Sequence, residues 1–165
     1  MTTATIFART FLKKLFINNN FSDMSHHNAI LLLGSNIGDQ KKNLEIAFER
    51  ITDKNILILS KSKFLYSEPV EFVSSNNFCN IALSIETDLS PIQLLKSLKE
   101  IEKSMGRSID SGMTRNYSDR VIDIDIVSYD NLIFFCNRLE IPHYRHLHER
   151  EFSRLLLDSL FLNRT

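Results

Sequence analysis

The sequence has few cysteines, no excess of charge and no long apolar run, and each absence narrows the class of protein. Its two cysteines, Cys79 and Cys136, are too few for a disulfide framework and form no cluster with zinc spacing, which favours a cytoplasmic location. The 20 lysines and arginines equal the 20 aspartates and glutamates, so we expect neither nucleic acid nor an anionic membrane as partner. No apolar run approaches the roughly 20 residues that a membrane-spanning helix needs. Any anion binding must therefore be local.

The first 28 residues lack the continuous apolar segment of a secretory signal. They are poor in acidic residues and carry Arg9, Lys13 and Lys14, which leaves a transit peptide open as an interpretation. We favour the alternative that residues 1–28 are a disordered leader or an over-called start, with Met24 as the initiator. With 165 residues, 43% of them hydrophobic, the chain has the size and composition of one globular domain. We expect this domain to span residues 29–165 and to be a monomer.

Strand and helix patterns follow one another from residue 29 onward. Apolar or alternating runs predict strands over residues 29–33, 56–66, 78–86 and 121–129. One helix is expected after Asp39, with these apolar residues at helical spacing: Leu44, Ala47, Phe48 and Ile51. With a second helix after residue 90, the order predicts an α+β, ferredoxin-like βαββαβ sandwich with a mainly antiparallel sheet. We expect both helices on one sheet face and the ligand site on the other.

The second helix has clear start and stop signals. Ser90 is a good N-cap, Pro91 suits the first helical position, and Gln93 can close a capping box. Gly106 is a suitable left-handed residue at the end. The predicted core stripe of this helix is Ile92, Leu95, Leu98, Ile101 and Met105. Beyond it we expect a mobile polar loop over residues 108–119, a short hairpin within 131–141 and a terminal helix over 148–160.

The strand over residues 78–86 places two chemically different sets of side chains on its two faces. The predicted core set is Cys79, Ile81, Leu83 and Ile85. Phe78 and Asn80 share the opposite face, where an aromatic plane and an amide suit a flat heterocycle. Ordinary cross-strand packing is the alternative for both.

Asp123 and Asp125 lie two residues apart on the last predicted strand, so they project from the same face. Together they can bind a hard divalent cation, which prefers carboxylate oxygen and which phosphoryl transfer requires. Taken alone, the pair is also compatible with two ordinary charges on an exposed strand. Arg120 precedes the pair and Arg107 follows the second helix, so two guanidinium groups could hold phosphate beside the carboxylates. Solvated surface charges are the alternative for the arginines.

Three histidines, His143, His146 and His148, form an H-x-x-H-x-H cluster after Pro142. This spacing raises zinc binding, and with it a zinc hydrolase, as an alternative. A contact with a nucleotide is the favoured role, because zinc sites usually draw three or four ligands from well-fixed elements and no cysteine lies nearby.

Together these segments resemble the 6-hydroxymethyl-7,8-dihydropterin pyrophosphokinase family. The matching segments are LLLGSNIGD at 31–39, YSEP at 66–69, FCN at 78–80, EKSMGR at 102–107, DRVIDIDIV at 119–127 and IPHY at 141–144. They occur in the family's order between residues 29 and 152, which is far more specific than any one motif. The resemblance implies a folate-biosynthesis transferase that moves the pyrophosphoryl group of ATP to the pterin and releases AMP.

The resemblance also implies roles for individual residues. Asp123 and Asp125 look like the ligands of Mg²⁺, expected as two ions with ATP, and join Arg107 and Arg120 as the catalytic residues. The implied ATP contacts are Glu102, Arg107, Tyr117, Arg120, His143, Tyr144 and Arg150. The implied pterin pocket is formed by Gly34, Pro69, Phe78, Asn80 and Phe152. Because no strong base stands out, we expect catalysis by positioning and charge neutralisation, with the loop over 108–119 closing to exclude water.

The sequence departs from the family pattern at two places. Ser118-Asp119 replaces the usual Gly-Pro or Gly-Ala before Arg120, and the histidine segment is one residue longer than the common pattern. The extra carboxylate of Asp119 either weakens ATP binding or faces solvent. A pterin- or nucleotide-binding module that has lost turnover is therefore the main alternative to an active enzyme, and the four intact phosphate-binding and metal-binding residues argue against it.

Overall fold

A computed structural model describes residues 7, 10, 26–69, 76–106 and 119–162 of the chain. Its main sheet contains β1 (His27–Ser35), β2 (Leu57–Lys61), β3 (Leu65–Ser67), β4 (Phe78–Thr87) and β5 (Asp123–Tyr129). The strands pair in the order β2-β4-β1-β5, β3 pairs with β4, and every pairing is antiparallel. This order, with α2 (Gln40–Asp53) after β1 and α3 (Pro91–Ser104) after β4, confirms the predicted ferredoxin-like α+β fold.

The two long helices begin where their capping residues predict. The side chain of Asp39 accepts a hydrogen bond from the Lys42 amide at the start of α2 (3.1 Å). At the start of α3, the Gln93 side chain accepts from the Ser90 amide (2.9 Å), which completes the capping box. Gly106 follows α3 with φ +102°, in the region that glycine adopts without a steric penalty.

The predicted core stripe of α3 is wrong at its first position. Ile92 is 50% exposed, whereas Leu94 is fully buried with Leu98 and Ile101. A helix turns by about 100° per residue, so Ile92 lies roughly half a turn away from Ile101. Leu94 lies four residues before Leu98 and seven before Ile101, so it projects from the same side of the helix and faces the core.

The second predicted strand, over residues 56–66, is two short strands, β2 and β3. The interruption lies at Ser62, whose amide donates to the Ala82 carbonyl and whose hydroxyl accepts from the Ala82 amide, both at 2.9 Å. Because a side chain takes the place of a backbone acceptor, the regular ladder stops there and resumes at Leu65.

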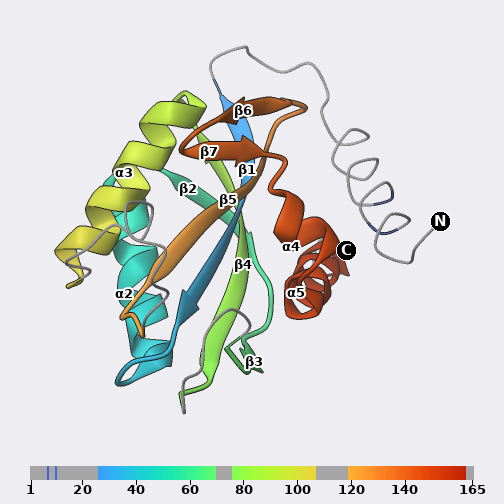
Figure 1. The fold of residues 1–165 in the computed structure, drawn as a ribbon. Helices are drawn as coiled ribbons and strands as arrows, with labels where there is room; N and C mark the ends of the chain where they lie inside the picture. Colours follow the sequence, from blue (N-terminus) through green and yellow to red (C-terminus); the bar gives the residue numbers. More distant parts are fainter. Residues whose placement is uncertain (1–6, 8–9, 11–25, 70–75, 107–118, 163–165) are drawn as a thin grey trace.

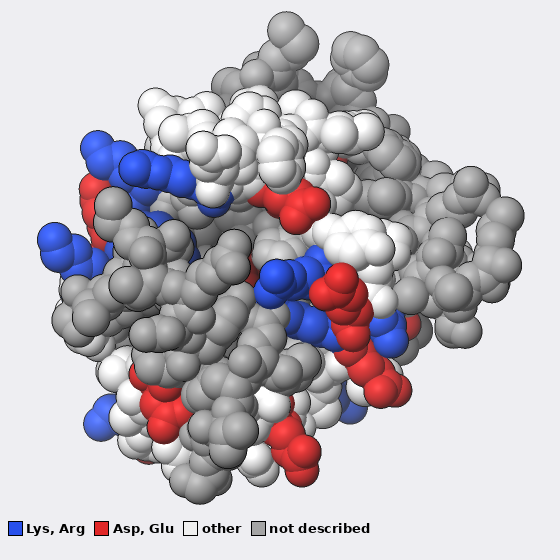
Figure 2. Space-filling model, viewed as in Figure 1, with Lys and Arg blue, Asp and Glu red and all other residues white. Residues whose placement is uncertain are grey.

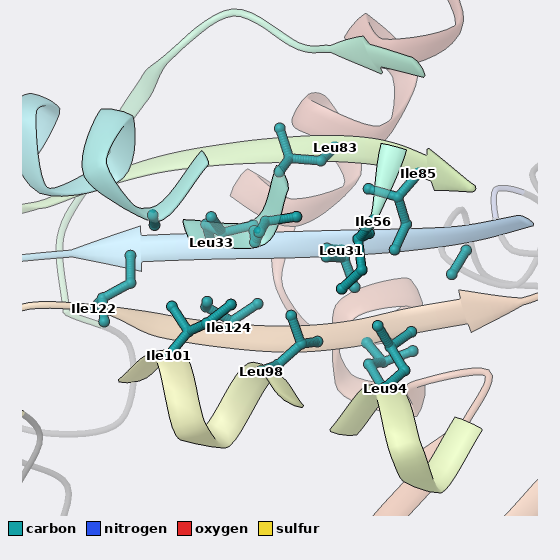
Figure 3. Packing of buried hydrophobic residues seen from close by; sticks show 14 of the residues in the cluster. Leu31, Leu33, Ile56, Leu83, Ile85, Leu94, Leu98, Ile101, Ile122 and Ile124 are labelled. Carbon is teal, nitrogen blue, oxygen red and sulfur yellow. The ribbon is translucent and has the colours of Figure 1, made fainter. Parts of the chain in front are cut away.

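Both faces of the sheet are covered, but to different extents. Helices α2 and α3 cover one face, where residues such as Leu31, Leu83 and Leu98 form the main core (Figures 1 and 3). The chain continues through a hairpin, β6 (Phe134–Cys136) and β7 (Leu139–Ile141), and then α4 (Tyr144–His148) and α5 (Glu151–Leu162). The hairpin and the terminal helix confirm the sequence prediction, although α5 begins later than predicted and α4 was missed.

Helix α5 packs on the face that the sequence left for ligands (Figure 1). Its Leu156, Leu157 and Leu160 form a second core with apolar residues of the sheet and α4, namely Ile30, Leu32, Ala82, Val127 and Leu147. No helix in the described ranges is long and apolar enough to cross a membrane.

Replacing Leu98 with alanine should lower the free energy of unfolding by about 2–5 kcal/mol, because it leaves a cavity beneath α3. Ile92→Ala on the same helix removes a half-exposed side chain and should cost far less. Urea unfolding of the two variants measures the difference. Equal losses would contradict the assignment of Ile92 to the solvent side.

Candidate active site

The register of three neighbouring strands brings three residues that the sequence predicted for the active site into one row across the sheet. Gly34 of β1 pairs with Asn80 of β4 on one side and with Asp123 of β5 on the other. Asp125 pairs with Leu32, one step further along the same face. The two carboxylates and the glycine-amide pair are therefore neighbours on the sheet face that α5 partly covers.

Arg120 lies directly beside the carboxylates. Its guanidinium donates to the Asp123 carboxylate (2.8 Å), and its side chain is only 9% exposed. Acidic and basic side chains also alternate on the face seen in Figure 2, without separation into single-sign patches among the described residues. At the carboxylate pair itself, Arg120 brings a guanidinium that could contact an anion.

Asn36 holds Arg120 in place, a role that sequence reasoning missed. The Asn36 side chain accepts from the Arg120 amide (2.7 Å), and the Asn36 amide donates to the Arg120 carbonyl (3.2 Å). The same side chain donates to Asp119 Oδ1 (2.6 Å), and Asn76 donates to Asp119 Oδ2 (2.8 Å). The carboxylate that departs from the family pattern is thus held by two amides. An asparagine shortly after the first predicted strand was the signal that the sequence offered.

Glu102 lies beneath the strand that carries the aspartates. It is 1% exposed, and one carboxylate oxygen accepts from the amide of Ile124, the residue between Asp123 and Asp125 (2.7 Å). Lys99 contacts both oxygens of the same carboxylate at 3.0 Å. In this structure Glu102 therefore fixes the backbone between the two aspartates, a contact that the sequence did not predict.

Asp125 contacts the histidine segment. Its Oδ2 lies 3.0 Å from His146 Nε2 and 3.9 Å from the Arg150 guanidinium. Burial raises the pKa of Asp125, but the hydrogen bond and charge of His146, with His143 and Lys99, outweigh it and hold the pKa well below its usual range. The carboxyl is therefore ionised and suited to a cation.

The three histidines do not form one cluster. His143 and His146 lie side by side, with ring centroids 4.3 Å apart, whereas His148 stacks on Tyr144. Among the described residues, the candidate metal-binding group joins Asp125 to His143 and His146 and leaves His148 out. Burial and the charge of His146 lower the pKa of His143 to about 4, so its imidazole is neutral at physiological pH.

The residues expected to hold a pterin lie around Gly34. A Cβ atom on Gly34 would come within 2.8 Å of Asn80 Oδ1 and 3.4 Å of the Phe78 ring, so both side chains lie close against the glycine. Asn80 is itself fixed by a hydrogen bond to Ser67 Oγ (2.9 Å). Pro69 is half-buried, and Phe152 packs against the second core beneath α5.

Two predicted site residues, Arg107 and Tyr117, lie outside the described residues. The same holds for Ser118 and for the predicted loop up to residue 118.

Paired carboxylates beside a buried arginine are typical of enzymes that transfer phosphoryl groups. Comparison with known proteins defines the class further: the chain belongs to the family described as 7,8-dihydro-6-hydroxymethylpterin-pyrophosphokinase (HPPK), whose family model matches residues 30–161. Enzymes of this family take part in folate biosynthesis, with ATP as donor and a pterin as acceptor. The prediction of family and enzyme class is confirmed.

Several named relatives resemble the chain. It is 36% identical over 125 residues to a 2-amino-4-hydroxy-6-hydroxymethyldihydropteridine pyrophosphokinase of Haemophilus influenzae, covering 75% of each protein. It is 38% identical over 146 residues to the folic acid synthesis protein FOL1 of Dictyostelium discoideum, covering 88% of this chain and 21% of that one. A folate synthesis bifunctional protein of Arabidopsis thaliana is 36% identical over 74% of this chain and 25% of its own length. The chain thus spans about a quarter or less of the two longer relatives.

Replacing Glu102 with glutamine should lower the free energy of unfolding by about 1–3 kcal/mol, because Lys99 and the Ile124 amide lose a charged acceptor. Glu100→Gln is the matched control, since Glu100 is exposed on the same helix and pairs with Lys54. Urea unfolding should show little change in the control. If both variants unfold alike, Glu102 does not stabilise the strand of the aspartates.

Proposed function

We propose that this chain transfers the pyrophosphoryl group of ATP to 6-hydroxymethyl-7,8-dihydropterin, with Mg²⁺ bound by Asp123 and Asp125. The observation that carries the proposal is the row in which Asp123, Gly34 and Asn80 pair across three strands. In this proposal the carboxylates that bind Mg²⁺ and the amide that contacts the pterin lie next to each other there, as a transfer between two bound substrates requires.

The side chains of β5 fit a magnesium ion. Both aspartates are partly exposed on one strand face, and the depressed pKa of Asp125 keeps it ionised. Carboxylate oxygens are the ligands that Mg²⁺ prefers. When bound, Mg²⁺ neutralises phosphate oxygens and aligns the attacking and leaving groups.

The pterin ring is proposed to lie over Gly34. The ring of Phe78 offers a stacking surface and the Asn80 amide both donates and accepts hydrogen bonds, while the bond to Ser67 fixes that amide before the ligand arrives. Pro69 and Phe152 complete the pocket in this proposal.

ATP is proposed to lie on the β5 side of the pterin, held by Arg107, Arg120, His143, Tyr144 and Arg150, with Tyr117 beside it. Glu102, which is buried beneath β5, is proposed to act on the nucleotide site through the Ile124 amide and not by direct contact. The partly buried guanidinium of Arg120, clamped by Asn36, suits a phosphate better than a freely moving surface arginine would.

The reaction forms a bond between the pterin hydroxyl oxygen and the β-phosphorus of ATP and breaks the bond from that phosphorus to the α-phosphate oxygen. AMP leaves with that oxygen, and the hydroxyl proton passes to water. The side chains contribute mainly by aligning the two substrates and by offsetting the negative charge. The Asp119 carboxylate accepts hydrogen bonds from the Asn36 and Asn76 side chains, which supports an active enzyme over a binding module.

We further propose that residues 29–165 form a single pyrophosphokinase domain preceded by a leader over 1–28. In this proposal the domain is a cytoplasmic monomer that binds small-molecule substrates and neither nucleic acid nor membrane.

The direct test is to incubate the protein with ATP, Mg²⁺ and 6-hydroxymethyl-7,8-dihydropterin and to measure AMP against a reaction without pterin. Asp123→Asn and Asp125→Asn should each lower kcat at least about 100-fold, since each removes one carboxylate charge from the proposed Mg²⁺ site. Asp158→Asn, an exposed residue of α5, is the control and should keep full activity. Tight binding of both substrates by the unmodified chain without AMP formation would instead favour a binding module.

Gly34→Ala should raise the KM for the pterin at least about tenfold while leaving the KM for ATP near its original value. The new methyl group would press on Asn80 Oδ1 and on the Phe78 ring, where the pterin is proposed to bind. Steady-state kinetics with each substrate varied in turn separates the two constants. Equal changes in both would place the pterin elsewhere.

A further inference from the structure

The histidine segment brings a group of potential metal ligands together, in addition to the ATP contacts proposed for it. We propose that Asp125, His143 and His146 form a binding site for a transition-metal dication such as Zn²⁺. The site shares Asp125 with the proposed magnesium site but differs from it in its other ligands. No pterin or nucleotide takes part in it.

A strand and a short helix with its capping residue bring the ligands together. Asp125 lies on β5, His143 is the residue before α4, and His146 is inside α4. Each offers one ligand atom, and these atoms all lie within 4.8 Å of one another. The three residues are therefore close in space although 18 residues separate Asp125 from His143 in the chain.

The separations are near those of a bound ion. Zinc binds nitrogen at about 2.0–2.1 Å and carboxylate oxygen at about 2.0–2.2 Å, so two ligand atoms on one ion lie roughly 3–4 Å apart. Asp125 Oδ2 and His146 Nε2 already have a separation of 3.0 Å. Closing the remaining distance requires a shift of roughly 1 Å or less in the side chains.

His146 has the supporting contact that metal-binding histidines usually have. Its other ring nitrogen, Nδ1, lies 2.7 Å from Ser153 Oγ, and both residues are fully buried. Such a contact fixes the orientation of the ring and directs Nε2 at the ion. Here it directs Nε2 at the carboxylate of Asp125.

His143 contributes a ring whose bonding capacity is not satisfied. Its Nδ1 is buried and has no hydrogen-bond partner within the described part of the chain. Buried polar atoms without a partner are rare and call for an explanation such as a ligand or an ion. A cation between the two imidazoles and the carboxylate supplies one.

The ligand chemistry selects the kind of metal. Two imidazole nitrogens with one carboxylate suit zinc and its first-row neighbours, whereas Mg²⁺ prefers an all-oxygen site. Three protein ligands also leave one tetrahedral position for water or another ligand. The site therefore differs from the magnesium pair in metal preference, and the two ions compete for Asp125.

Arg150 opposes metal binding. Its guanidinium lies 3.2 Å from His146 Nε2 and 3.9 Å from Asp125 Oδ2, so a like charge stands beside the proposed ion. The side chain must turn toward solvent when the metal enters. Removing the charge of Arg150 should therefore increase the affinity of the site for the metal ion.

A purely structural reading explains part of the same geometry. In it, His146 links Ser153 to Asp125 by hydrogen bonds and holds the carboxylate in place without any metal. That reading accounts for His146 but leaves His143 Nδ1 without a partner. Metal titration separates the two.

The experiment titrates the metal-free full chain with Co²⁺, without ATP or pterin, and follows visible absorption, with Zn²⁺ added afterwards to displace the cobalt. We expect one Co²⁺ per chain and intense bands typical of a four-coordinate site. His146→Gln keeps a hydrogen-bonding side chain but should weaken binding at least about tenfold. His148→Gln is the matched control, because His148 lies on the same short helix but stacks on Tyr144 outside the group. Arg150→Ala should bind Co²⁺ more tightly.

Absence of the bands at millimolar Co²⁺ would overturn the proposal, as would equal weakening by His146→Gln and His148→Gln or weaker binding by Arg150→Ala. Thermal melting of each variant shows whether it is folded, and Ser153→Ala serves as a second variant if His146→Gln unfolds. If the chain binds cobalt but forms no AMP, the metal site is supported and the pyrophosphokinase function is contradicted. If the chain forms AMP but binds no cobalt, the function is supported and the metal site is contradicted.

Discussion

The site depends on the register of β1 between its two antiparallel neighbours. Gly34 faces Asn80 across one ladder and Asp123 across the other, and a slip of one residue on either side would turn the partner's side chain to the opposite face of the sheet. The apolar residues on the core face of β1 prevent such a slip, because Leu31 and Leu33 would then leave the core beneath α2 and α3. Core packing thus determines which polar groups meet on the other face.

The charged side chains around the site each contact a partner of opposite charge or a hydrogen-bond donor. Glu102 is buried, but Lys99 and the Ile124 amide satisfy its carboxylate. Arg120 pairs with Asp123, and Asp125 faces His146 and Arg150. An isolated buried charge would cost several kcal/mol, so these pairings allow the fold to hold charged side chains at and beneath the sheet. A chain with no net charge can in this way present a strongly polar surface at one place.

Much of the fold was predictable because local patterns and caps agree with it. The order of elements, the capping box at Ser90 and the Asp123–Asp125 pair follow from periodicity and from short motifs. The misses have a common physical origin: they depend on partners distant in sequence. Ser62 ends β2 through Ala82, Asn36 acts through Arg120, and the approach of His146 to Asp125 appears only once α4 packs beside β5. The packing of α5 on the second sheet face was also not predictable. The amphipathic pattern of a terminal helix shows that one side is buried, but not which face of the sheet it packs on.

The contact between Asn36, Asp119 and Asn76 has a consequence for how the protein can vary. Asn36 lies directly after β1, Asn76 lies just before β4 and Asp119 precedes Arg120, and the Asp119 carboxylate accepts hydrogen bonds from both asparagine side chains. Because Asp119 directly precedes Arg120, the two asparagines also fix the backbone from which the guanidinium projects. A substitution at one of these three positions alone would loosen Arg120, so we expect the three positions to change together during evolution rather than one at a time.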